Sequence, residues 1–153
     1  MILELKVSDK AKSMLNKMPG LVVPAVFKGM TKGLDLAVGT AKREYLSGPR
    51  PERLGVRTGH LRRSIRSQTV IRGDEVEGRI GTNVLYARIH EKGGVITPKR
   101  AKVLRFQIPG VGWRSAKRVV MPARPFLRPA IMDSLEAISK AIGKEIETAF
   151  GKL

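Results

Sequence analysis

Hydrophobic and polar positions follow a helical pattern in two stretches of the chain. In residues 23–45 apolar side chains recur every three or four positions, which is the spacing of one face of an amphipathic helix. Residues 128–150 repeat this spacing with Ile131, Leu135, Ile138, Ile142, Ile146 and Phe150. The pattern therefore predicts two long helices, one in the N-terminal half and one at the C-terminus.

Three glycines fall inside the first helical pattern, at Gly29, Gly33 and Gly39. Each costs about 1 kcal/mol relative to alanine in a helix interior. We interpret them as places of close packing against another helix or a sheet. The stripe itself is typical of a core helix rather than of a ligand-binding element.

Alternating apolar and polar positions predict an antiparallel hairpin in the middle of the chain. Residues 65–72 and 75–80 alternate, and the glycine of residues 73–74 suits a two-residue turn. This register places Ile71 opposite Val76 on one face of the hairpin. The arginine and glutamate that flank the turn then lie opposite each other on the other face, so the pairs on both faces support this register.

Shorter patterns predict the remaining elements of the N-terminal half. Residues 1–7 alternate as a strand, and residues 8–18 suit a short helix that Pro19-Gly20 ends. Residues 47–60 contain two prolines, three glycines and three arginines, and they predict a long mobile loop. Thr58 can cap a short helical turn after it.

The stretch after the hairpin predicts a short helix and then an arm. Asn83 can cap a helix over 84–92, which Gly93-Gly94 ends as a left-handed stop. Within residues 97–120, two alternating runs flank a Pro-Gly turn. They predict a long basic β-hairpin arm whose tip, with Trp113, projects from the rest of the chain.

Together these elements predict one α+β domain over residues 1–153. A small antiparallel sheet is packed by the long helix of the N-terminal half and by the C-terminal helix. A chain of 153 residues is large enough to form a core without disulfides or metals.

Positive charge is the strongest signal in the composition, because 30 Lys and Arg against 13 Asp and Glu give a net charge of +17. No carboxylate occurs between Lys92 and Met132, although ten basic residues do. Such a block attracts a polyanion, which can be nucleic acid or an acidic protein surface. Aromatic residues are only 5% of the chain, which disfavours a surface that stacks on single-stranded bases.

The residues of catalytic and metal sites are scarce. The chain has no cysteine and two histidines, His60 and His90. His90-Glu91 lacks the second histidine of a zinc protease, and no phosphate-binding glycine loop is present. A nuclease could be assembled from these two histidines and Glu91, but their spacing does not favour it. We therefore expect no enzyme activity, no cofactor and no metal.

The chain also lacks the signals of membrane insertion and secretion. No apolar run approaches the roughly 18–20 residues that span a bilayer. The N-terminus has no signal-peptide layout. We expect a soluble protein, made inside the cell.

Residues 121–131 contain three prolines, which favour an extended approach to the last helix. We interpret this stretch as a rigid elbow that docks the last helix onto the sheet. Phe126 and Leu127 are expected to enter the core at the corner.

Two segments of the chain carry a resemblance to a known family. Residues 86–94 read Tyr-Ala-Arg-Ile-His-Glu-Lys-Gly-Gly, and residues 122–127 read Pro-Ala-Arg-Pro-Phe-Leu. This pair resembles the signature of tail-completion proteins of tailed bacteriophages, also called virion-morphogenesis or minor tail proteins. Residues 57–65 are loosely similar to a third family segment. The matching motif residues are Tyr86, His90, Gly93, Gly94, Pro122, Ala123, Arg124, Pro125, Phe126 and Leu127.

The resemblance implies a structural subunit that finishes the tail and joins it to the capsid at the neck. It implies an oligomer, often a ring, that performs no chemistry. Tail-tube, terminator and head-completion proteins are its implied partners, and the virion is its implied location after synthesis in the host cytoplasm. The segment from Thr97 to Val120 is longer and more basic than the family signature requires.

Six basic residues are our candidates for contact with acidic neighbours or with DNA in the tail channel. They are Arg50, Arg53, Arg57, Arg114, Lys117 and Arg118. The alternative hypothesis is a free DNA- or RNA-binding protein without catalytic activity. Its support is the net charge and the basic arm, although no helix-turn-helix or zinc finger is legible.

Overall fold

A computed structural model describes residues 1–6, 19–48 and 53–151. The architecture is α+β, as predicted. In chain order the elements are β1 (Ile2–Lys6), α2 (Pro19–Thr40), the π-helical turn η1 (Ala41–Tyr45), α3 (His60–Ser64), β2 (Arg66–Arg72), β3 (Glu75–Gly81), α4 (Ala87–Lys92), β4 (Gly94–Ile96), β5 (Leu104–Ile108), β6 (Gly112–Ala116), β7 (Val119–Met121) and α5 (Leu127–Phe150). The predicted helix over residues 8–18 and the candidate contact residue Arg50 lie outside the described residues.

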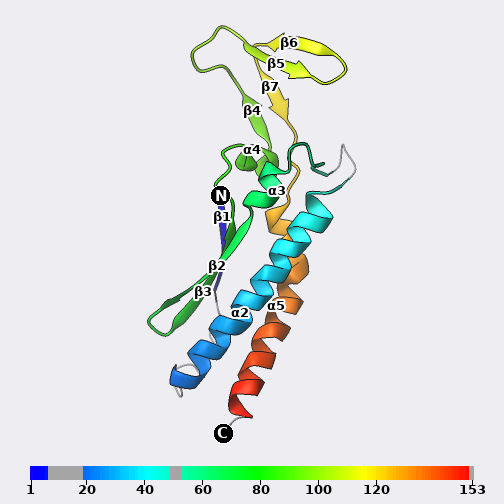
Figure 1. The fold of residues 1–153 in the computed structure, drawn as a ribbon. Coiled ribbons are helices and arrows are strands. Elements are labelled where there is room, and N and C mark those ends of the chain that lie inside the picture. Colours follow the sequence, from blue (N-terminus) through cyan, green and yellow to red (C-terminus); the bar gives the residue numbers. More distant parts are fainter. Residues whose placement is uncertain (7–18, 49–52, 152–153) are drawn as a thin grey trace.

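Helix α2 is the centre of the body, because it lies along α5 on one side and along β2 and β3 on another (Figure 1). Its buried side chains include Val26 and Leu34, and they form one core with Ile80 of β3. Phe126 and Leu127 are fully buried in the same core. The elbow therefore places these two side chains as the sequence predicts.

The last helix packs chiefly on α2, whereas the sequence had suggested the sheet. Two of the three glycines explain how close the helices come. A Cβ on Gly29 would lie 2.5 Å from the Cα of Ile142, and one on Gly33 would lie 2.7 Å from the Cα of Ile138. Both glycines are therefore required by the helix pair. Gly39 differs, since a Cβ there would meet only the side chain of Arg43.

The small sheet has the strand order β1–β3–β2, and all its pairs are antiparallel. Ile71 pairs with Val76, so the predicted register of the hairpin is confirmed. Gly73 has a φ of 60° in the turn, a conformation that glycine adopts without strain. The face with Val76 packs on α2, and Glu77 and Arg79 lie on the opposite face.

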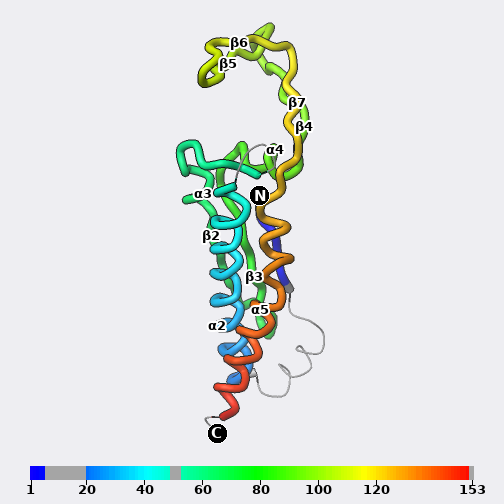
Figure 2. Tube along the Cα trace, turned by 90° about the vertical axis from the view of Figure 1, so that its right-hand side faces the viewer, coloured from blue at the N-terminus to red at the C-terminus, as the bar shows by residue number. Residues whose placement is uncertain are grey.

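The arm projects from one end of the body, away from the two long helices (Figures 1 and 2). It consists of two short ladders, in which β4 pairs with β7 and β5 pairs with β6. The predicted single hairpin over residues 97–120 is thus longer, from Gly94 to Met121, and is interrupted between the ladders. Trp113 is 61% exposed near its tip.

In the part of the chain that the structure describes, no helix is both long and apolar enough to cross a membrane.

Candidate functional site

Helix α5 begins without a capping side chain of its own, because Phe126 occupies its N-cap position. The carboxylate of Glu91, from α4, supplies the missing acceptor. It accepts hydrogen bonds from the backbone N–H groups of Phe126 at 2.7 Å, Leu127 at 3.0 Å and Arg128 at 3.0 Å. The first N–H groups of a helix have no partner within the helix, and a negative charge there also complements the helix dipole. Glu91 therefore holds the start of α5.

Two further contacts join the same segments. The backbone N–H of Arg124 donates to the C=O of His90 at 2.7 Å. Gly93 has a φ of 67°, and a Cβ on it would lie 2.8 Å from the amide nitrogen of Ala123. Only glycine fits at this position. We call residues 86–94 together with residues 121–128 the junction. Both ends of the arm connect to it.

The start of α4 differs from the sequence prediction. The helix begins at Ala87 rather than at residue 84, Tyr86 occupies its N-cap position, and no side chain caps it, so the capping role predicted for Asn83 is wrong. The hydroxyl of Thr82 accepts the N–H of Val84 at 3.1 Å. Tyr86 and His90 then lie one turn apart with their rings edge to face, 5.9 Å between centroids.

A cleft of about 590 Å³ opens beside the junction. One wall is formed by residues 53–62, and the other by Tyr86, His90, Met121 and Arg124. We call it the arginine cleft, because Arg53, Arg57, Arg62 and Arg124 all line it. The fold thus brings two of the six candidate contact residues together with three motif residues. Arg114, Lys117 and Arg118 lie instead on the arm.

The loop wall of the arginine cleft is tied to the body through Arg53. Its guanidinium donates to the C=O of Glu44 at 2.9 Å and lies 5.7 Å from the centroid of the Tyr45 ring. Gly59 precedes α3 with a φ of 70°. The His60 N–H donates to the Thr58 hydroxyl over 3.4 Å, so Thr58 contributes only a long hydrogen bond to the start of α3.

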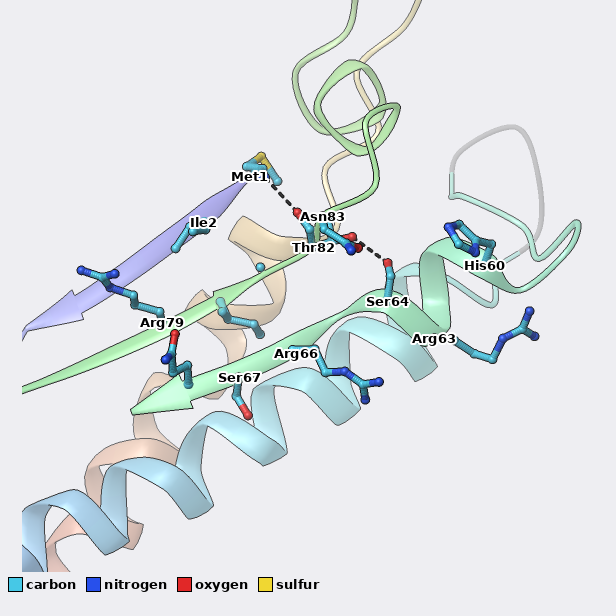
Figure 3. A pocket seen from close by; sticks show the side chains of 13 residues that line it. Met1, Ile2, His60, Arg63, Ser64, Arg66, Ser67, Arg79, Thr82 and Asn83 are labelled. Carbon is cyan, nitrogen blue, oxygen red and sulfur yellow. Dashed lines mark hydrogen bonds between the residues drawn. The ribbon is translucent and has the colours of Figure 1, made fainter. Parts of the chain in front are cut away.

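A second hollow, of about 650 Å³, lies beside the sheet near α3 (Figure 3). The amino group of Met1 donates to the C=O of Thr82 at 3.0 Å along its edge. Arg79 is engaged by Glu77 at 3.0 Å and by Glu4 at 3.3 Å. Figure 3 shows Arg63 and Arg66 extending away from the strands, so the charges of this hollow do not converge on one point.

Comparison with known proteins gives one result. A family model described as the phage virion morphogenesis family matches residues 35–149. The chain belongs to this family. The match includes α2 from Asp35 onward, the arginine cleft, the junction, the arm and almost all of α5. Neither the curated proteins nor the solved structures gave a match.

Membership of the phage virion morphogenesis family makes the chain a structural protein of phage assembly that works with other phage proteins. It confirms the resemblance carried by the two sequence segments. The junction shows a physical reason for their pairing: each segment completes the hydrogen bonds of the other. Glu91, which the list of motif residues omitted, makes most of these bonds.

The predicted catalytic alternatives can be compared with the geometry. Among the residues that the structure describes, no three His, Asp or Glu side chains are grouped so that they could hold a metal ion. His60 and His90 both line the arginine cleft. The adjacent acid, Glu91, is buried, and both of its oxygens accept backbone N–H groups. Its role in the structure is that of a helix cap.

Proposed function

We propose that this member of the phage virion morphogenesis family completes the tail and joins it to the capsid at the neck. In this proposal the chain acts as one domain and without catalysis. Several copies assemble, as a ring, against tail-tube, terminator or head-completion proteins. The helix pair and sheet form the body, and the arm reaches the neighbouring subunits.

The observation that carries the proposal is the uncovered arm. Seven of its large apolar side chains are exposed: Val95, Ile96, Val103, Ile108, Val111, Trp113 and Val120. Two-stranded ladders are marginally stable by themselves in water, and clustered exposed apolar groups mark interaction surfaces. The arm therefore has the properties of an element that completes its packing against another subunit.

Complementation of a gene deletion tests this proposal. The variant joins β4 to β7 directly, with a Gly-Ser turn in place of residues 97–118, and leaves the junction intact. We expect wild-type protein to restore infectious particles, while the armless variant yields separate heads and tails in electron micrographs. Normal joined particles with the armless variant, present at the wild-type level, would rule out the proposed role of the arm.

One observation favours DNA contact as a second candidate function. Between residues 97 and 120 the arm carries Lys99, Arg100, Lys102, Arg105, Arg114, Lys117 and Arg118 and no carboxylate. If these residues bind phosphates, the affinity of the purified protein for duplex DNA falls steeply with salt. Charge reversal at Arg114, Lys117 and Arg118 then lowers the salt dependence. Binding that is weak and unchanged by this triple variant would exclude DNA as the partner of the arm.

A further inference from the structure

We propose that the arginine cleft binds an acidic peptide segment that carries a large apolar side chain and belongs to a neighbouring protein of the particle. The inference deepens the proposed function, since it names the chemistry of one partner and the place where it docks. It does not depend on the arm, so the two can be tested separately.

The charge of the cleft is of one sign. Arg53, Arg57 and Arg62 contribute from the loop wall, and Arg124 contributes from the junction wall. Within the described residues, no Asp or Glu side chain lines the cleft. The nearest acid in the junction, Glu91, is committed to the backbone of α5. Carboxylates on an incoming chain would therefore meet the guanidinium groups of the loop wall.

The basic groups of the cleft are arginines, and no lysine lines it among the described residues. The planar guanidinium binds a carboxylate through two parallel hydrogen bonds, which a lysine cannot do. Arginine, tyrosine and methionine are also the residues enriched at protein–protein interfaces. The lining of the cleft, with Tyr86 and Met121 beside the arginines, has this composition.

Apolar side chains make the cleft more suitable for a peptide than for nucleic acid. Leu46, Leu54, Val56 and Leu61 line it together with Met121. A volume of about 590 Å³ is that of a pocket for small groups or side chains. A DNA duplex presents phosphates on a convex surface and no apolar group that would fill such a recess. An acidic segment with a leucine or phenylalanine satisfies both kinds of lining.

The cleft lies where a partner held by the arm can reach it. Met121 ends β7 and lines the cleft, so the wall of the cleft continues directly into a root of the arm. The opposite wall is tied to η1 through Arg53. A neighbour that packs along the arm can thus insert an acidic segment at its base, between two walls that the body holds.

Fluorescence anisotropy with the purified full chain tests the inference. The probe is a fluorescein-labelled octapeptide, Glu-Asp-Leu-Glu-Phe-Asp-Glu-Leu, titrated at physiological salt. Two competitors accompany it: the same peptide with serine at its three apolar positions, and a short DNA duplex. We expect saturable binding of the probe, at least tenfold weaker binding of the serine peptide, and little competition by the duplex.

A matched pair of double variants locates the binding. Arg57→Glu with Arg62→Glu changes the cleft, whereas Arg114→Glu with Arg118→Glu makes the same change of charge on the arm. We expect the cleft variant to weaken probe binding about 30-fold or more and the arm variant to weaken it less than threefold. Circular dichroism and thermal unfolding verify that both variants are folded. As a second location measurement, NMR signals of the Tyr86 and His90 rings should shift on probe addition.

Several results would overturn the inference. The first two are the absence of saturable probe binding and an equal loss of probe affinity in the two double variants. The other two are a serine peptide that binds as tightly as the probe, and a DNA duplex that binds more tightly than the probe. These results leave the neck assignment untouched, because that assignment rests on particle assembly. Conversely, if the armless variant assembles normal particles, the proposed role of the arm fails, but peptide binding to the cleft is still tested by the anisotropy measurement.

Discussion

Glu91 and Phe126 are separated by 35 residues in the sequence, and the carboxylate of one lies 2.7 Å from the amide nitrogen of the other. This hydrogen bond joins the short helix before the arm to the N-cap residue of the helix after it. The arm is formed by the part of the chain between these two residues. The junction therefore keeps the ends of the arm in place whatever the arm contacts.

The Glu91 cap predicts a large loss of stability when its carboxylate is removed. Glu91→Ala leaves buried N–H groups of α5 without acceptors, and we expect the free energy of unfolding to fall by about 2–4 kcal/mol. Glu91→Gln retains one acceptor oxygen and should cost less. Urea denaturation measures both. Glu136→Gln, at an exposed position of the same helix, is the control and should change stability by less than about 0.5 kcal/mol.

The close approach of α2 and α5 predicts opposite effects for two substitutions of glycine by alanine. Gly29→Ala introduces a Cβ at 2.5 Å from the Cα of Ile142, and overpacking of this kind typically costs about 1–3 kcal/mol. Gly143→Ala, also inside a helix, places its Cβ in open space. It should instead raise stability, by up to about 1 kcal/mol. Thermal unfolding of both variants and of wild type shows whether each substitution lowers or raises the stability.

Glu145 predicts a dependence of stability on pH. Its carboxylate, on α5, binds Lys32 and Lys28 of α2. The hydrogen bonds and charges of these lysines hold the pKa of Glu145 below its ordinary value of 4.5. The unfolded chain then takes up a proton at this group before the folded chain does. The stabilisation is therefore present above about pH 4.5 and is lost as pH falls through the lowered pKa.

Glu145→Gln should make the free energy of unfolding less dependent on pH in the acid range. Part of the dependence will remain, because Glu77 behaves similarly. Burial opposes ionisation of Glu77, but Arg79 and Arg72 lower its pKa overall. Urea titrations at pH 3 to 7 measure the difference. Identical slopes for wild type and variant would contradict the assigned role of Glu145.

Tyr45 predicts a spectroscopic signature of the contact between η1 and α5. Its hydroxyl donates to the carboxylate of Asp133. This hydrogen bond, with a smaller contribution from burial, raises the pKa of Tyr45 above 10.0. In a Tyr86→Phe background, Asp133→Asn should therefore shift tyrosinate absorbance to lower pH. Asp35→Asn, which alters a carboxylate bound to Ser67 instead, should leave the titration unchanged.

Local patterns predicted the parts of the fold that local forces determine. The register of β2 and β3 follows from a two-residue turn and from alternation, so Ile71 could be paired with Val76 from sequence alone. The apolar stripes of α2 and α5 could also be recognised in the sequence. The sequence did not predict that α5 packs on α2 rather than on the sheet, because an apolar stripe does not identify its partner. The glycines at 29 and 33 held that information.

The arginine cleft and the Glu91 cap depend on contacts between distant residues, and no short motif encodes them. A signal for the cap was nevertheless present. The last helix begins at Leu127 and has Phe126, rather than Ser, Thr, Asp or Asn, at its N-cap position, so an acceptor had to come from elsewhere. Arg53 and Arg57 were chosen for their charge. Only the fold shows that they share a cleft with Tyr86, His90 and Arg124.

The junction also determines how mechanical load enters the protein. A pull on the arm passes through β4 and β7 into residues 93–94 and 121–124, and from there into the first turn of α5. The long axis of α5 runs beside α2 over most of its length (Figure 1). Tension therefore becomes shear between two interlocked helices, in which many contacts must slip together before the body yields.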